Sequence, residues 1–180
     1  VGANFQDADL AGAIVDASAY TSKELAGSNL VRADPALAAR LPGVLEQHEA
    51  WVQSGSRSGQ RADLSRAFLA GRSFKGANLS AALLSYAVLI EADLTEARLA
   101  MADLTFADLR RAKLVNADLR GVNFDRAMLE DADLSGASMT PLSGAGVSSG
   151  DRTWQARLVR ARLARARLRG TIMQIGRAHV

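Results

Sequence analysis

Large apolar residues recur at every fifth position through the middle of the chain, from residue 62 to residue 139. Alanine stands two positions before them in fourteen of sixteen cases, the exceptions being Arg72 and Val122. The residue between is commonly Asp, Asn or another polar group, so the unit reads A-(D/N)-L-x-x. The sixteen large residues are Leu64, Leu69, Phe74, Leu79, Leu84, Leu89, Leu94, Leu99, Leu104, Leu109, Leu114, Leu119, Phe124, Leu129, Leu134 and Met139.

A period of five suits neither an α-helix nor a flat strand. Five residues at 100° each place successive leucines about 140° apart around a helix, and strand alternation has period two. The pattern instead predicts a coil in which each unit forms one side and a turn. Leucine and alanine point inward, so large and small side chains together fill a narrow interior.

Several units resemble the consensus of the pentapeptide-repeat family, namely ADLTE (92–96), ADLTF (102–106), ADLRR (107–111) and ADLRG (117–121). The resemblance implies an all-β fold, a right-handed quadrilateral β-helix with four units per turn. Residues twenty apart would then lie one above the other on the same face. We therefore expect residues 62–139 to form about four turns, roughly 19 Å tall at the usual strand spacing.

The N-terminal block, residues 1–34, carries the same rhythm less faithfully. Lys23 falls in an inward position, where an unpaired ammonium is costly, so we expect a bulge or loop there. The positions that keep the spacing are Phe5, Leu10, Val15, Tyr20, Leu25 and Leu30, with alanine at Ala3, Ala8 and Ala13.

A short helical insertion is predicted over residues 35–54. Asp34 and Pro35 form an N-cap followed by proline at the first helical position. Pro42 should kink the helix or divide it in two. The residues with helical spacing are Leu37, Leu41, Val44, Leu45, His48, Trp51 and Val52.

Beyond the main solenoid, residues 140–155 are rich in Gly and Ser and are predicted to be a loop extruded from the coil. Leucines then recur at five-residue spacing from Leu158, which predicts one basic turn over residues 156–174. Residues 175–180, IGRAHV, match one reading frame of a common sequencing adapter, and we expect them to be an artefact. The start at Val1 indicates a missing natural N-terminus.

The composition excludes several classes of protein. The chain has no cysteine, so disulfides, thiol catalysis and thiolate metal sites are excluded, which fits a cytoplasmic protein. No apolar run is long enough to span a membrane. The net charge of +3 arises at the C-terminal end, because residues 151–180 carry 8 basic and 1 acidic groups whereas residues 62–139 carry 9 and 11.

The aspartates of the repeat do not predict a catalytic or metal site. They share one position of the unit, where short polar side chains bond local backbone amides at turns. His48, the only histidine before residue 175, is expected to pack on a helix face. No phosphate-binding loop or zinc-ligand spacing occurs, so we expect a non-enzyme with no cofactor. The aspartates are Asp63, Asp93, Asp103, Asp108, Asp118 and Asp133.

Charge favours a protein partner over nucleic acid. Some pentapeptide-repeat proteins mimic DNA with an acidic rod and act on DNA gyrase, but here basic residues interrupt the acidic surface, as where Lys113 falls between Asp93 and Asp133. A nucleic acid is also disfavoured, because the C-terminal arginines would encircle the rod with no aromatic residue among them. Their expected role is to discourage end-to-end stacking. These arginines are Arg157, Arg160, Arg162, Arg165, Arg167 and Arg169.

An outward apolar edge is the feature that the repeat does not require. Phe68, Val88 and Met128 share one column, interrupted by Asp108, and two aromatic residues share the next column between Arg66 and Arg126. Such an edge marks an interface, or else the helical insertion covers it; both alternatives stay open. The candidate partner-binding residues are Phe68, Tyr86, Val88, Phe106 and Met128.

The sequence therefore predicts a non-catalytic protein-binding or scaffolding solenoid of unknown partner, with a homodimer left open. One alternative is a DNA-mimicking regulator of gyrase or another topoisomerase. The other is the repeat region of a larger enzyme or multidomain protein.

Overall fold

The computed structural model describes residues 34–143 and 153–173 and nine separate positions before them. These nine are Phe5, Ala8, Leu10, Val15, Ser18, Ala19, Lys23, Leu25 and Ser28. The elements in chain order are α1 (Pro35–Gln53), β1 (Ser138–Met139), β2 (Leu142–Ser143), β3 (Thr153–Trp154) and β4 (Ile172–Met173). The sequence expectations for Ala3, Ala13, Tyr20, Leu30 and residues 175–180 lie outside the described residues.

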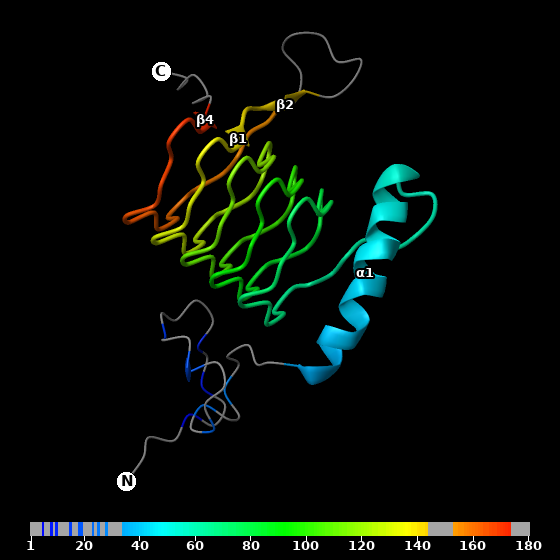
Figure 1. Cartoon of the computed structure of the whole chain (residues 1–180), viewed down its shortest axis with the longest axis horizontal. Coiled ribbons are helices and arrows are strands. Elements are labelled where there is room, and N and C mark those ends of the chain that lie inside the picture. Colours follow the sequence, from blue (N-terminus) through cyan, green and yellow to red (C-terminus); the bar gives the residue numbers. More distant parts are fainter. Residues whose placement is uncertain are drawn as a thin grey trace.

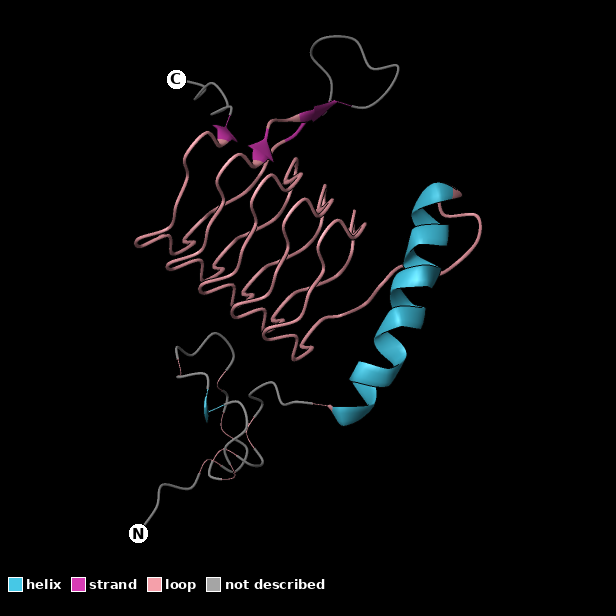
Figure 2. Cartoon of the chain, viewed as in Figure 1, coloured by secondary structure: helices cyan, strands magenta, loops and turns pink. Residues whose placement is uncertain are grey.

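From residue 62 the chain winds as a regular coil, with α1 at one end (Figure 1). Isolated parallel bridges join Asp63 to Leu83, Leu83 to Asp103 and Asp103 to Asn123. The spacing of twenty confirms that four five-residue units make one turn. Most of the coil carries no named strand (Figure 2), because the chain turns a corner after each single bridge.

The backbone of each unit is bonded to both neighbouring turns. The Leu84 N–H donates to the Asp103 carbonyl at 2.8 Å, and the Asp103 N–H donates back to Ala82 at 3.0 Å. A bond from the Ala87 N–H to the Leu84 carbonyl closes the corner. The residue two after each leucine has positive φ, for example 59° at Ala81. Every side of the coil is thus built from the same small set of backbone bonds.

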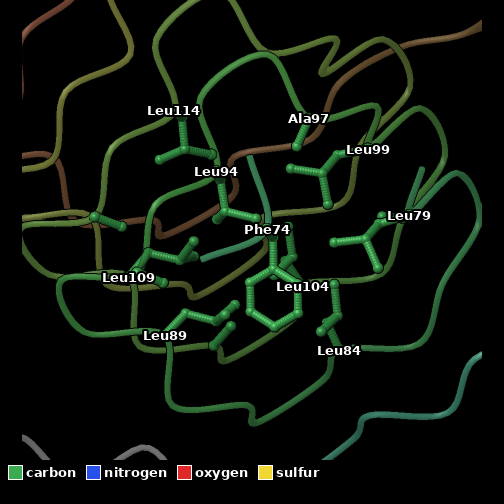
Figure 3. Close-up of a cluster of buried hydrophobic side chains, with 14 of the residues drawn as sticks. Phe74, Leu79, Leu84, Leu89, Leu94, Ala97, Leu99, Leu104, Leu109 and Leu114 are labelled. Atoms are coloured by element: carbon green, nitrogen blue, oxygen red, sulfur yellow. The ribbon is translucent and has the colours of Figure 1, made fainter. Parts of the chain in front are cut away.

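The core is the inside of the coil, where the leucines of all four faces fill the interior (Figure 3). Leu84, Leu104 and Phe124 are completely buried, as are the small residues two positions before them, Ala82, Ala102 and Val122. Each such leucine contributes about 1.5–3 kcal/mol by burial. The inward assignment made from the period is confirmed.

Helix α1 begins where the sequence indicates, since the Asp34 carboxylate accepts from the Ala36 N–H at 2.9 Å. It runs unbroken through Pro42, so the expected division there is wrong. Pro42 and Ala38 are both exposed, so the Ala38 carbonyl that loses its partner can bond water. Burial of Leu37 and Leu41 on the coil offsets the cost.

α1 covers the end of the coil where the first turn begins. Leu37 and Leu41 join the same core cluster as Leu64. The buried His48 accepts the Ala62 N–H at Nδ1, 3.0 Å away. The helix therefore caps an end that would otherwise expose leucine side chains and unpaired backbone groups.

The last turn is displaced in register. Asn123 pairs with Arg157, and β1 pairs in parallel with β4 through Ser138 and Ile172. In each of these two pairs the partners are 34 residues apart in sequence instead of 20. The difference, 34 − 20 = 14, corresponds to an excursion of 14 residues. Its base is the antiparallel pair of β2 and β3, where Leu142 faces Trp154. After this detour the same winding resumes.

Described residues of the N-terminal segment pack against the side of the coil. Leu10, Val15, Ala19 and Leu25 pack on a cluster formed by the buried residues of one face. The bond from the Ala8 N–H to the Phe5 carbonyl repeats the corner bond of the main coil. Lys23 is exposed at a bend.

Candidate functional site

The aspartates of the repeat have a local structural role. In each case one carboxylate oxygen accepts the backbone N–H two residues further on, as Asp93 does from Thr95 at 3.0 Å. The same bond occurs at Asp63, Asp103, Asp108, Asp118 and Asp133. These bonds begin the turn at the corners that carry an aspartate, so the interpretation of the aspartates as turn residues is confirmed.

His48 is part of the cap and not of a polar cluster. Its ring stacks on Trp51 with centroids 5.7 Å apart. Burial lowers the pKa of His48, against smaller opposing effects of the Ser80 backbone and Glu49. Within the described residues no three His, Cys, Asp or Glu side chains are grouped to hold a metal ion. No helix in this part of the chain is long and apolar enough to cross a membrane.

The apolar edge expected from the sequence is only partly exposed. Val88 and Met128 are 2% and 5% exposed, so these two candidates are not available to a partner. Val88 packs with Ile90 and Phe68 beneath residues of the N-terminal segment. The only cover expected from the sequence was the helical insertion. Met128 is held in its column between Asp108 and Arg162. The continuous edge is therefore a correction to the sequence interpretation.

Arg110 fixes the N-terminal segment to this face. Its Nη2 atom is 2.6 Å from Asp108 and donates to the Val15 carbonyl at 2.7 Å. Asp108 is almost fully buried and Arg110 mostly buried, so the pair is well shielded from water. Asp108, the polar residue that interrupts the apolar column, thus orients the arginine that binds the N-terminal segment.

The two remaining candidates form a stacked column with arginines. The rings of Tyr86 and Phe106 lie 4.8 Å apart with planes within 6° of parallel. The Arg66 guanidinium lies 4.7 Å from the Tyr86 ring, and that of Arg126 lies 5.1 Å from the Phe106 ring. We call these four residues the arginine–aromatic column. Both rings are half-buried, and both arginines are exposed.

The backbone places this column at one corner of the coil. All four residues have φ between 56° and 60°. The Tyr86 N–H donates to Thr105 at 2.9 Å, and the Phe106 N–H donates to Asp125 at 3.0 Å. Arg66 and Arg126 form no ion pair with any described residue, so each guanidinium keeps N–H groups free to donate in its plane.

Two pockets lie between α1 and the first turn, and one reaches the column. The smaller, about 130 Å³, is lined by Arg66, Phe68, Asp63 and the N-terminal part of the helix. The larger, about 260 Å³, is lined by Gly43, Val44, Gln47, Gln60, Arg61 and Asp63.

Ion pairs neutralise much of the acidic surface. Arg111 Nε lies 2.8 Å from Glu91, and Arg120 Nη2 lies 2.7 Å from Asp118. The C-terminal arginines do the same for the turn before them. Their pairs are Arg157 with Asp125, Arg162 with Glu130, Arg165 with Asp131 and Arg167 with Asp133. The basic last turn is therefore the electrostatic complement of an acidic one.

An exposed apolar cluster at another corner was missed from the sequence. Met101 and Trp154 are 42% and 44% exposed. They meet over Gly121, where an added Cβ would lie 3.3 Å from both Leu142 Cδ1 and Trp154 Cβ. The outward position of Met101 in the repeat could have indicated an exposed apolar residue. Trp154, however, reaches this corner only through the 14-residue excursion.

Comparisons with known proteins agree with this geometry. The family model described as pentapeptide repeats matches residues 73–105 and 102–140, with 8 copies. No curated protein is significantly similar to the chain.

Three solved structures illustrate the similarity. The pentapeptide repeat protein alr5209 from Nostoc PCC 7120 is 38% identical, over 54% of this chain and 79% of that one, with a TM-score of 0.31. Rfr23 from the cyanobacterium Cyanothece 51142 is 27% identical over 67% and 69%, with a TM-score of 0.33. HetL from Nostoc sp. strain PCC 7120, involved in heterocyst differentiation regulation, is 32% identical over 65% and 60%, with a TM-score of 0.22.

The five-residue period, the twenty-residue stacking and the matched family model lead to one conclusion. Members of the matched family fold as right-handed quadrilateral β-helices. The chain belongs to the pentapeptide repeat family.

Proposed function

We propose that this chain, a right-handed quadrilateral β-helix with a helical insertion, is a non-catalytic protein-binding or scaffolding module. The observation that carries the proposal is the arginine–aromatic column. It combines two half-buried rings with two exposed guanidinium groups that form no ion pair with a described residue. Aromatic and arginine side chains of this kind dominate binding energy at protein interfaces.

The column defines the chemistry of the partner surface. Arg66 and Arg126 are stacked at the two ends, so their in-plane N–H groups suit carboxylates. Tyr86 and Phe106 between them offer an apolar strip. We infer a protein partner that presents an apolar side chain flanked by acidic residues.

A photocrosslinking experiment tests this site. Benzoylphenylalanine at position 86 keeps an aromatic ring in the column, and we expect it to crosslink a discrete partner in cells of the source organism. Glu96 is the matched control, because it has the same place in the repeat on another face and a φ of 60°. Arg66→Glu with Arg126→Glu should abolish the crosslink. Equal crosslinking from position 96, or a crosslink insensitive to charge reversal, would contradict the proposal.

DNA mimicry toward gyrase is a weaker hypothesis. Such mimicry needs a sustained negative surface, whereas acidic groups along this coil are paired with arginine, as in Asp118 with Arg120 and Asp131 with Arg165. We expect no inhibition in a gyrase supercoiling assay. Inhibition that survives loss of the arginine–aromatic column would favour mimicry instead.

A further inference from the structure

One side of the coil carries charges whose sign alternates from turn to turn. We call it the alternating face, and it comprises residues 91–95 and the residues stacked on them in the following turns. The pairing of Asp93 with Lys113 and of Lys113 with Asp133 sets the order of the turns. The charged residues are, turn by turn, Glu91 and Asp93, Arg111 and Lys113, Asp131 and Asp133, and Arg165 and Arg167. The turns therefore read acidic, basic, acidic and basic.

The two inner turns of this face carry charges that the chain itself does not fully neutralise. Lys113 is exposed and forms no ion pair with a described residue. The Asp133 carboxylate lies 3.6 Å from the Arg167 guanidinium, which is a loose contact. Arg111 bonds Glu91 at 2.8 Å, yet both side chains are more than half exposed. These groups can therefore bind opposite charges on another surface.

Short side chains lie beside the charged columns. Thr95, Val115 and Ser135 form the next column of the same face and are half-buried. The described N-terminal residues pack on a different face, around Val88 and Ile90, and α1 lies at the end of the coil (Figure 1). Within the described part of the chain the alternating face is thus low and uncovered, so a second flat surface can approach it.

We propose that the alternating face binds a second copy of the chain, with the two coils antiparallel. A two-fold axis that crosses the face between the turns of Lys113 and Asp133 sets each acidic turn of one copy opposite a basic turn of the other. Lys113 then faces Asp133 of the second copy, and Arg111 faces Asp131 of the second copy. These central contacts occur twice, because the axis relates each copy to the other.

The outer turns match in the same arrangement. The acidic turn of Glu91 and Asp93 lies opposite the basic turn of Arg165 and Arg167. All four turns of the face therefore meet opposite charges. This holds because the order acidic, basic, acidic, basic changes sign at every turn when it is read backwards.

Other arrangements of two copies bring like charges together. Parallel coils would set every turn opposite itself, and an antiparallel pair shifted by one turn would do the same at the Lys113 turn. Like charges directly opposite each other are destabilising, so the pattern selects one register. An unrelated partner would have to carry the same alternation at a spacing of about 4.8 Å. Since the contact is polar and confined to one side of the coil, we expect a weak dimer that salt dissociates.

Sedimentation velocity of the full 180-residue chain tests the proposal. We expect a dimer at about 20 mM salt and a monomer at about 500 mM salt. Lys113→Glu alone and Asp133→Lys alone should each weaken dimerisation by about tenfold or more, because each places two like-charged pairs across the axis. An equimolar mixture of the two variants should restore a dimer. The carboxylate introduced at position 113 of one chain then faces the ammonium introduced at position 133 of the other, and this rescue shows that both variants are folded.

Crosslinking distinguishes antiparallel from parallel coils. The chain has no cysteine, so introduced thiols are unique. Position 95 lies opposite position 169 of the second copy in the antiparallel dimer, but opposite itself in a parallel one. With a short bismaleimide, a mixture of Thr95→Cys and Arg169→Cys chains should therefore crosslink, whereas Thr95→Cys chains alone should not.

Arg160→Glu is the matched control. Arg160 is exposed at another corner of the coil with φ 59° and forms no ion pair with a described residue. Its charge reversal should leave dimerisation unchanged. A chain that stays monomeric at low salt would overturn the proposal. So would a dimer insensitive to Lys113→Glu, a mixture of the two charge variants that stays monomeric, or Thr95→Cys chains that crosslink to one another.

Discussion

The rings of Tyr86 and Phe106 stack 4.8 Å apart although the residues are twenty positions apart in the chain. One turn of the coil separates them, and their N–H groups donate to carbonyls of the next turn. The spacing between rings is therefore the spacing between turns, which matches the separation of hydrogen-bonded strands. Stacking is a direct product of the repeat.

This stacking should be measurable as an energetic coupling. In a double-mutant cycle of Tyr86→Ala and Phe106→Ala, we expect a coupling energy of about 0.5–1.5 kcal/mol in urea unfolding. Glu96 and Asn116 occupy the same positions on another face without an aromatic pair. Their cycle should give a coupling near zero, and equal couplings in the two cycles would refute the stack.

The same substitution should have different effects in the middle and in the last turn. Leu104 is fully buried, so Leu104→Ala should cost about 2–5 kcal/mol by loss of burial and creation of a cavity. Leu163 has the same place in the repeat but is only half-buried. Leu163→Ala should therefore cost less than half as much, measured by urea denaturation. A larger loss at Leu163 would show that the last turn is covered in solution.

Corner positions should prefer glycine. Ala81 has φ 59°, a conformation that costs a residue with a Cβ about 1–2 kcal/mol. Ala81→Gly removes this strain at a smaller entropic cost and should stabilise the coil by about 0.5–1 kcal/mol. Ala77→Gly, at an inward position with ordinary φ, should destabilise it by a similar amount. Thermal unfolding of both variants checks the difference in sign.

The helical cap should weaken in mild acid. Burial lowers the pKa of His48 in the folded state below its unfolded value of about 6.5. The unfolded chain then binds more protons, so stability present above about pH 6.5 is lost as the pH falls through the folded pKa. Protonated Nδ1 can no longer accept the Ala62 N–H. Glu49 and Arg61 also act on this imidazole, in opposite directions.

The control for this pH effect is His48→Gln, which keeps a hydrogen-bond acceptor but does not titrate. Its stability should change less than that of the parent chain between about pH 7 and pH 5. Hydrogen exchange at Ala62, measured over the same range, reports the cap directly. An unchanged exchange rate at Ala62 in the parent chain would rule out this mechanism.

The coil could be predicted from the sequence because the residues that determine it are close together in the chain and recur with a fixed period. One apolar residue in five determines which side chains are inward, and Asp93 and its equivalents determine the turns. The alignment of Tyr86 with Phe106 followed from the period alone. Docking of segments outside the repeat could not be predicted in this way, because no period relates Leu10 or Leu41 to the surfaces that they contact.

Of the predicted outward apolar residues, only those of the arginine–aromatic column, Tyr86 and Phe106, keep exposed surface beside free arginines, and their binding to a partner stays a prediction. The exposure of Tyr86 is set by the residues of its own corner of the coil, which the repeat places. Val88, in contrast, is buried by residues more than sixty positions away in sequence. The pairing of Arg165 with Asp131 was also inaccessible, because it requires the 34-residue register that follows the excursion. Long-range packing decided these points, and a repeat does not encode it.

The antiparallel pair of β2 and β3 has a consequence for how this coil can vary. Fourteen residues leave the winding and return to it, and Asn123 still pairs with Arg157 as if nothing intervened. Length changes at this corner are therefore decoupled from the core. A foreign sequence could be grafted here, and its evolution or redesign would proceed without altering the leucine column that keeps the protein folded.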